Sequence, residues 1–237
     1  MHITRRSLLQ ATAALVASPQ LASSQQPSLE GASASLVADA LRASGRDPRA
    51  LTMSRDIRLV TTPGKTIVGP AVTTKWELAR EGTTAGSIRR FVFEPVDRAP
   101  AGSIWVVASG TDQLLSMFGD LIGLACKQRG LAGAVTDSGC RDVGAMDAIG
   151  FPVFAKGTVL YGPGDVIRPV AADVPVVCGG VDVRPGDVVV ADVDGVIVVP
   201  SEAIADVARA KDELLGKEAE VRRKIESGET LAAAYSL

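Results

Sequence analysis

The sequence has a single histidine, His2, only three cysteines and few aromatic residues. Because His2 lies at the extreme N-terminus, the rest of the chain has no histidine, which excludes a Ser-His-Asp hydrolase and a histidine-ligated zinc centre. The cysteines, Cys126, Cys140 and Cys178, are odd in number and lack the close spacing of zinc or redox motifs, so no disulfide framework is predicted. We interpret each as a small buried hydrophobic residue.

The chain also lacks an excess of charge of one sign. It carries 25 Lys and Arg against 27 Asp and Glu, for a formal net charge of -2. Proteins that bind nucleic acid usually carry a basic face, so no nucleic-acid partner is predicted. A length of 237 residues with 46% hydrophobic content suits one domain with one good core.

The N-terminal segment resembles an export signal. Thr4-Arg5-Arg6-Ser7-Leu8-Leu9 is similar to the twin-arginine motif, the apolar run Ala11–Ala17 follows it, and Ala22-Ser23-Ser24 offers small residues for cleavage. The apolar run is too short for a permanent membrane span. The sequence therefore predicts a signal over residues 1–30, a domain over residues 31–237 and a periplasmic protein. The alternative is a chance arginine-rich terminus on a cytoplasmic protein.

Beyond this segment, short apolar strands alternate with helical patterns. Leu36, Val37, Ala40 and Leu41 have helical spacing, and a charged amphipathic helix ends near Glu226. This mixture predicts a single compact α/β domain with a mixed sheet. The expected strands are Thr66–Thr74, Ile104–Ala108, Ala132–Thr136, Pro152–Ala155, Pro175–Cys178, Val188–Ala191 and Val196–Val199.

A second helix is predicted to begin after Gly119 and to stop at Gly130. The first amides of a helix have no intrahelical acceptor and lie at the positive end of the helix dipole. The backbone of Gly119, Asp120, Leu121 and Ile122 therefore suits a carboxylate ligand. Gly119 has no side chain and lets a ligand approach closely.

An Arg-Asp pair follows the strand Ala132–Thr136. This strand leads into the polar turn Asp137-Ser138-Gly139, and then come Cys140, Arg141 and Asp142. Taken alone, Arg141 beside Asp142 is typical of an exposed ion pair, which contributes little to the stability of a protein. Cys140 is placed as a nucleophile would be, but no histidine is available to activate it.

The Arg-Asp pair belongs to a series of ordered motifs. They are GDLI at 119–122, RGLAGAVTDSGCRD at 129–142 and GFPVFAKG at 150–157, together with MSRDIR at 53–58, VGPAVT at 68–73, VVCGG at 176–180, RPGD at 184–187 and DVDGV at 192–196. Together these motifs resemble the 4-hydroxy-4-methyl-2-oxoglutarate/4-carboxy-4-hydroxy-2-oxoadipate aldolase family, which shares its fold with the regulator of ribonuclease E activity. The resemblance covers nearly everything after residue 30.

The resemblance implies a role for each matching residue. Asp142 would ligate a divalent metal, Mg²⁺ or Mn²⁺, and Arg141 would contact a small α-keto-acid substrate. The amides from Gly119 to Ile122 would bind its carboxylate. Hard cations prefer oxygen and often keep waters, so one protein carboxylate can suffice. The family also implies a swivelling β/β/α fold and a homotrimer or homohexamer.

The expected reaction is metal-dependent retro-aldol cleavage of a 4-hydroxy-2-oxo acid to pyruvate, with oxaloacetate decarboxylation as a side activity. The general base stays open between a water associated with the metal, Asp137 and Asp112. Asp39 is either a residue that reaches the site across a subunit boundary or part of a solvated face. The segment Trp76–Phe93 is less regular than the family pattern and carries three arginines: Arg80, Arg89 and Arg90. If the function differs from that of the family, substrate choice is expected to differ here.

Two non-catalytic functions remain as alternatives. One is a regulatory protein of this fold that inhibits a ribonuclease by contact. The other is an exported protein that binds small carboxylates without turning them over. The Arg141-Asp142 pair and the export signal favour the lyase over the ribonuclease regulator.

Overall fold

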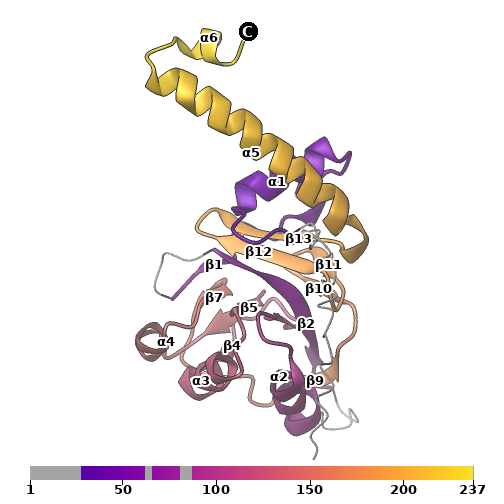
Figure 1. The fold of residues 1–237 in the computed structure, drawn as a ribbon. Coiled ribbons are helices and arrows are strands. Elements are labelled where there is room, and N and C mark those ends of the chain that lie inside the picture. Colours follow the sequence, from indigo (N-terminus) through magenta and orange to yellow (C-terminus); the bar gives the residue numbers. More distant parts are fainter. Residues whose placement is uncertain (1–27, 62–65, 81–86, 237) are drawn as a thin grey trace, which may run out of the picture.

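A mixed eight-stranded sheet runs through the centre of the protein (Figure 1). The computed structural model describes residues 28–61, 66–80 and 87–236. The strand order is β1-β7-β5-β3-β2-β12-β13, and β9 pairs with the second half of β2. The strands are β1 (Arg58–Leu59), β2 (Ile67–Leu78), β3 (Ile104–Ala108), β5 (Gly133–Thr136), β7 (Val153–Ala155), β9 (Ile167–Ala172), β12 (Val188–Asp192) and β13 (Gly195–Val199).

Strands β2, β3, β5 and β7 run parallel to one another. Parallel neighbours require crossover connections, which helices provide here. In Figure 1 these helices lie together on one side of the sheet, where they bury Trp105, Phe118 and Phe151. They are the π-helical turn η2 (Arg89–Phe93), α2 (Glu94–Arg98), α3 (Asp120–Gln128) and α4 (Val143–Ile149).

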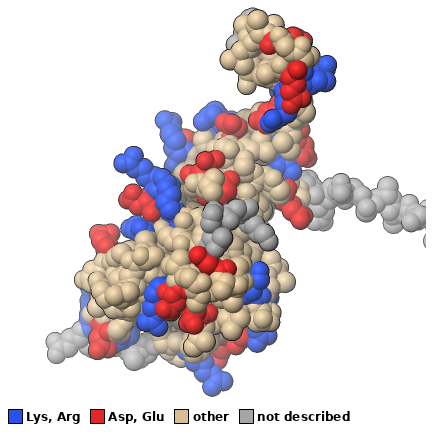
Figure 2. All heavy atoms as spheres, turned by 90° about the vertical axis from the view of Figure 1, so that its left-hand side faces the viewer, with Lys and Arg blue, Asp and Glu red and all other residues tan. Residues whose placement is uncertain are grey.

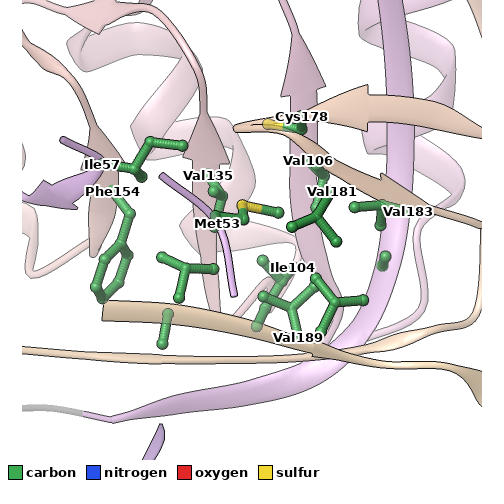
Figure 3. Close-up of a cluster of buried hydrophobic side chains, with 14 of the residues drawn as sticks. Met53, Ile57, Ile104, Val106, Val135, Phe154, Cys178, Val181, Val183 and Val189 are labelled. Atoms are coloured by element: carbon green, nitrogen blue, oxygen red, sulfur yellow. The ribbon is translucent and has the colours of Figure 1, made fainter. Parts of the chain in front are cut away.

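The antiparallel part of the sheet is covered by two other helices. Strand β12 pairs with both β2 and β13, and α1 (Ala34–Ala43) and α5 (Ile204–Glu226) pack over it through a separate apolar cluster. The end strands β1 and β13 approach each other, so the sheet is nearly closed. Its interior is an apolar core that includes Ile104, Val106 and Val189 (Figure 3).

Two smaller sheets complete the domain. Strands β10 (Val176–Cys178) and β11 (Val181–Val183) form a hairpin. Strands β4 (Ser116–Phe118), β6 (Gly139–Cys140) and β8 (Gly157–Thr158) form a parallel sheet, and they follow β3, β5 and β7 along the chain. The small sheet is therefore built from segments that leave the carboxyl ends of the parallel strands, where α/β proteins commonly bind ligands.

Most predicted elements are confirmed within a residue or two, and the chain folds as a single mixed α/β domain. Strand β2 continues past its expected end at Thr74 into the segment Trp76–Phe93, as far as Leu78. It continues because β9 adds antiparallel to this half of β2, with a register shift between Lys75 and Trp76. The helix η2 then occupies the end of the segment.

The C-terminal helix α5 packs on the domain only near its start. Val207, Ala208 and Lys211 are buried, whereas the rest projects away from the body and is followed by the short helix α6, Leu231–Ala234 (Figure 1). On the face shown in Figure 2, basic and acidic side chains are interspersed along this helix and the body. The remaining short elements are η1 (Pro48–Leu51) and η3 (Ser201–Ala203).

The predicted export signal lies almost entirely outside the described residues, which begin at Ser28. Leu29 is already buried, and the Lys211 ammonium donates to the Ser28 carbonyl at 2.6 Å. Residues 28–30 therefore pack as part of the domain. Within the described ranges, no helix combines the length and the apolar character that a membrane crossing needs.

Candidate active site

The helix α3 begins where the sequence predicts, with Gly119 as its N-cap in an extended conformation. Two of the expected free amides have partners inside the protein. The Leu121 amide donates to Asp120 Oδ1 at 2.8 Å, and the Asp120 amide donates to Asp142 Oδ2 at 3.4 Å. The start of this helix thus already holds a carboxylate, that of Asp142, as the positive end of a helix dipole favours.

Arg141 and Asp142 connect β6 to α4. The Arg141 amide donates to the Phe118 carbonyl, which continues the pairing of β4 with β6 beyond Cys140. Asp142 has a left-handed backbone, with φ 57° and ψ 34°, and its carbonyl accepts the first hydrogen bonds of α4. A non-glycine residue in this region is uncommon and often occurs at functional sites. The small sheet therefore places this pair beside the start of α3.

The Arg141-Asp142 pair and the start of α3 meet at Gly119. A β-carbon at this position would lie 2.9 Å from Asp142 Oδ2 and 3.3 Å from Arg141 Nε. The same two side chains form an ion pair, with 3.3 Å between Arg141 Nε and Asp142 Oδ2. Both remain partly open to solvent, with 50% and 40% of their side-chain surfaces exposed. The residues predicted from separate motifs are thus brought together at one place.

A cavity of about 520 Å³ opens beside this cluster. Gly119, Ile122 and Arg141 form one part of its wall. The rest of the wall is mostly apolar. Part of it comes from the segment Trp76–Phe93, where substrate choice is expected to differ if the function differs from that of the family. The sequence did not point to the remainder, which comes from β4, β9 and the segment before β9. The other lining residues of the cavity are Trp76, Ile88, Val92, Phe93, Ser116, Met117, Phe118, Gly162, Pro163, Gly164, Ile167, Arg168 and Pro169.

The aspartates considered as general bases lie elsewhere. Neither Asp112 nor Asp137 lines the cavity, and Asp137 Oδ1 accepts from the Ser109 amide at 2.8 Å. Asp39 lies on α1, over the antiparallel part of the sheet, and pairs with Arg42 at 2.9 Å on an exposed face. Within one protomer Asp39 is part of a solvated face.

The cysteines are buried and free, as the sequence predicts. Burial raises the pKa of Cys126 to about 12. Burial, followed by the nearby charge of Asp142, raises the pKa of Cys140 to about 11. The pKa of Cys178 is also raised well above its ordinary value, mainly by burial. Since the thiolate is the nucleophile, Cys140 is inert near neutral pH despite its place beside Arg141.

A metal at this site would have few protein ligands. Among the residues that the structure describes, no group of three or more histidine, cysteine, aspartate or glutamate side chains could hold a metal ion. Asp142 Oδ2 is used by Arg141 and the Asp120 amide, whereas no hydrogen bond from a described residue reaches Oδ1. The donor set therefore fits a largely hydrated, oxygen-preferring cation held through one carboxylate oxygen.

The fold and the cluster around Gly119 define an aldolase/regulator type of α/β protein. The sequence pattern of the RraA-like family, described as Aldolase/RraA, matches residues 34–198. The chain belongs to this family.

Among its relatives is a protein of Halalkalibacterium halodurans named "Putative 4-hydroxy-4-methyl-2-oxoglutarate aldolase", which is 34% identical over 139 residues, 56% of this chain and 60% of the relative. Protein DlpA of Legionella pneumophila is 27% identical over 72% of this chain, which is only 27% of its own length. The chain thus matches less than two thirds of each of these relatives.

Solved structures match over more of the chain. An uncharacterized protein from Pseudomonas syringae superposes with a TM-score of 0.74 and 25% identity, over 87% of this chain and 94% of that one. RraAS2 of Streptomyces coelicolor, described as an unusual member of the RNase ES inhibitor RraA family, has a TM-score of 0.68 and 27% identity. The match covers 80% of this chain and 91% of RraAS2.

Proposed function

We propose that this protein is a divalent-metal-dependent carbon-carbon lyase that cleaves a 4-hydroxy-2-oxo acid and releases pyruvate. The observation that carries the proposal is the convergence of Gly119, Arg141 and Asp142, with a β-carbon at Gly119 only 2.9 Å from Asp142 Oδ2. Membership of a family whose name includes aldolases, and a relative named as one, support the same reaction class.

Asp142 would hold the cation, Mg²⁺ or Mn²⁺, through its second carboxylate oxygen. When bound there, the cation supplies Lewis-acid polarisation of the 2-keto group. Arg141 fixes the other oxygen of Asp142 and so orients the carboxylate. Its planar guanidinium, half exposed, keeps donors for the substrate carboxylate and for the negative charge that develops on the keto oxygen.

The start of α3 orients the acid end of the substrate. Gly119 leaves room for the side chains of Asp142 and Arg141 at the helix end, and the dipole there favours negative charge. Cleavage breaks the C3–C4 bond, and its electron pair passes to C3 to give the enolate of pyruvate, which takes up a proton. The C4 hydroxyl loses its proton and becomes the carbonyl of the second product. Neither Asp112 nor Asp137 lines the cavity, so neither is assigned as the base.

Oxaloacetate tests this proposal because its decarboxylation passes through the same enolate. Purified protein is incubated with oxaloacetate and Mg²⁺ or Mn²⁺, with and without a chelator, and pyruvate is measured. We expect metal-dependent pyruvate release above the rate with metal alone. A rate equal to that of free metal would contradict lyase activity.

The likeness to RraAS2 favours a second candidate, a binding protein that regulates a ribonuclease by contact. An exported binder of small carboxylates would keep the same pocket without turnover. The oxaloacetate assay separates both from the lyase, because neither would release pyruvate.

We also propose a homotrimer or homohexamer and export through residues 1–30. The first is supported by large exposed side chains near the site: Leu121 is 75% exposed, Leu160 90% and Tyr161 64%. Apolar exposure of this kind is typical of surfaces that bind a partner. Light scattering of the purified protein would give the oligomeric state.

A further inference from the structure

We propose that the apolar part of the cavity beside Arg141 receives the C4 substituent of the substrate, and that this substituent is uncharged and apolar. Resting on the lyase function above, this means that the second product is an aromatic or branched aliphatic aldehyde rather than a second keto acid. The same pocket would bind an α-keto acid with such a substituent even without turnover.

The cavity is continuous with the candidate active site. Gly119, Ile122 and Arg141 belong both to the cavity wall and to the cluster that would hold the keto acid. A substrate with its acid end at the start of α3 can therefore extend into the cavity. The volume of about 520 Å³ lies in the range of pockets that enclose small organic ligands.

The far wall is mostly apolar, and the polar atom that Trp76 adds to it, the buried indole Nε1, is an uncharged donor with no hydrogen-bond partner among the described residues. Trp76 and Ile167 are at least nine-tenths buried, and Val92 packs with them in the same cluster. Phe93 and Ile88 border the cavity with 51% and 41% of their surfaces exposed. Among the lining residues that the structure describes, Ser116 carries the one hydroxyl, and this hydroxyl donates to the Phe118 carbonyl at 2.9 Å.

Among the described lining residues, the charged side chains are Arg141 and Arg168. Arg168 is already engaged: its Nη1 donates to the carbonyls of Gly164 and Ile167, and its Nη2 pairs with Asp165 at 2.7 Å. Its charge is thus compensated within the loop before β9. Arg141 remains for the acid end of the substrate.

Two other arginines, Arg89 and Arg90 on η2, contact side chains outside the cavity wall. Arg89 pairs with Glu94 at 3.4 Å, and Arg90 lies over the Phe91 ring at 5.3 Å. Neither lines the cavity. A second carboxylate on the C4 substituent would therefore enter a mostly apolar space in which the described lining residues offer no further uncompensated positive charge, and this is costly. An apolar substituent would instead gain from burial, by about 25 cal/mol for each Å² removed from water.

Binding tests the inference independently of turnover. Calorimetry with Mg²⁺ present compares 2-oxo-4-phenylbutanoate with 2-oxoglutarate, which share the keto-acid end and differ in the distal group. We expect the phenyl compound to bind at least about tenfold more tightly, as one well-buried apolar group allows. Equal binding, tighter binding of 2-oxoglutarate, or no binding of either would overturn the inference.

Turnover then separates this inference from the lyase proposal. The substrates are 4-hydroxy-2-oxo-4-phenylbutanoate, which gives pyruvate and benzaldehyde, and 4-hydroxy-4-methyl-2-oxoglutarate, which gives two pyruvates. We expect kcat/KM to be at least about tenfold higher for the phenyl substrate. Oxaloacetate turnover with a preference for the dicarboxylate would overturn the inference and leave the lyase standing. Tight binding of the phenyl compound with no turnover of any substrate would contradict the lyase proposal and leave the inferred apolar pocket standing.

A matched pair of variants tests the position of the substituent. Ile88→Lys places a cation at the rim of the cavity, and Leu215→Lys places one on α5, at nearly the same exposure, 41% against 44%. Ile88→Lys is expected to shift the binding preference toward 2-oxoglutarate by about tenfold, whereas Leu215→Lys leaves it unchanged. An equal response of the two variants would overturn the proposed location.

Discussion

Gly119 lies so close to Asp142 that a β-carbon on Gly119 would stand 2.9 Å from Asp142 Oδ2. The two residues come from different motifs and meet because β4 and β6 are paired, with Phe118 opposite Cys140. The backbone of Gly119 is extended, with φ -136°, so its conformation does not itself require glycine. Glycine is required here by the space that Asp142 and Arg141 occupy.

Gly119→Ala should therefore impair the site without unfolding the protein. The new methyl group must displace the carboxylate of Asp142 or the guanidinium of Arg141, and a shift of about 1 Å can cost roughly 100-fold in rate. Metal-dependent pyruvate release measures the effect.

The control is Gly216→Ala on α5, where a β-carbon meets nothing within 4 Å. It should leave activity unchanged and raise stability by up to about 1 kcal/mol through helix propensity. Equal activity of the two variants would contradict the role given to the space at Gly119.

Arg141→Lys tests the geometry of the guanidinium. A lysine keeps the charge but loses the planar set of donors, so we expect kcat/KM for pyruvate release to fall by about one to two orders of magnitude. Arg129→Lys is the control, since Arg129 is similarly exposed, 53% against 50%, and also pairs with an aspartate. A loss no larger than that of Arg129→Lys would argue against a specific role for Arg141.

The thiols offer a test by pH. Burial raises the pKa of Cys140 to about 11 and that of Cys126 to about 12, so both stay protonated at pH 8. We expect the native protein to resist thiol reagents and to keep full activity in their presence, whereas the unfolded chain reacts with three equivalents.

The raised pKa values also make the free energy of unfolding depend on pH. Above about pH 9 the thiols of the unfolded chain ionise while those of the folded protein stay protonated, which favours unfolding. The protein should therefore keep its full stability below pH 9 and lose part of it as the pH rises toward 11 or 12. Rapid labelling of Cys140 in the folded protein at pH 8 would show that its burial is wrongly described.

Export is tested with a reporter fused to residues 1–30. We expect the fusion to reach the periplasm and the replacement of both Arg5 and Arg6 by lysine to retain it in the cytoplasm. A fusion that lacks the segment gives the background. Export that is indifferent to the double replacement would remove the twin-arginine interpretation.

Local signals made much of this structure predictable. The helix α3 has a glycine before it and cations and a glycine after it, and β3 and β5 are short apolar runs with clear ends. Strands β6 and β8 have two residues each, too few to show any periodicity. The helix α4 was also missed, because its N-cap, Asp142, has a left-handed conformation that the residue pattern does not predict.

The site was predictable in part for the same reason. Gly119 and the Arg141-Asp142 pair belong to recognisable motifs, so their proximity was expected. The cavity was predictable only through the segment Trp76–Phe93, because its wall joins segments far apart in sequence, such as Trp76 and Ile167, through the pairing of β2 with β9. Such long-range pairing depends on the whole fold rather than on local sequence.

Asp142→Asn tests the central claim most directly. Asparagine tolerates the left-handed backbone of this position, so the variant removes the charge with little added strain. Asp97→Asn is the control, because Asp97 is also exposed and paired with an arginine. Titration with Mn²⁺, followed by paramagnetic resonance, and pyruvate release from oxaloacetate are measured on both variants.

We predict that Asp142→Asn binds Mn²⁺ roughly 100-fold more weakly, the upper end of effects around a metal site, and loses metal-dependent pyruvate release. Its thermal midpoint should stay within about 4 °C of the parent, as for an exposed ion pair worth under about 1 kcal/mol. Asp97→Asn should match the parent in both assays. Undiminished Mn²⁺ binding and pyruvate release in Asp142→Asn would contradict the account.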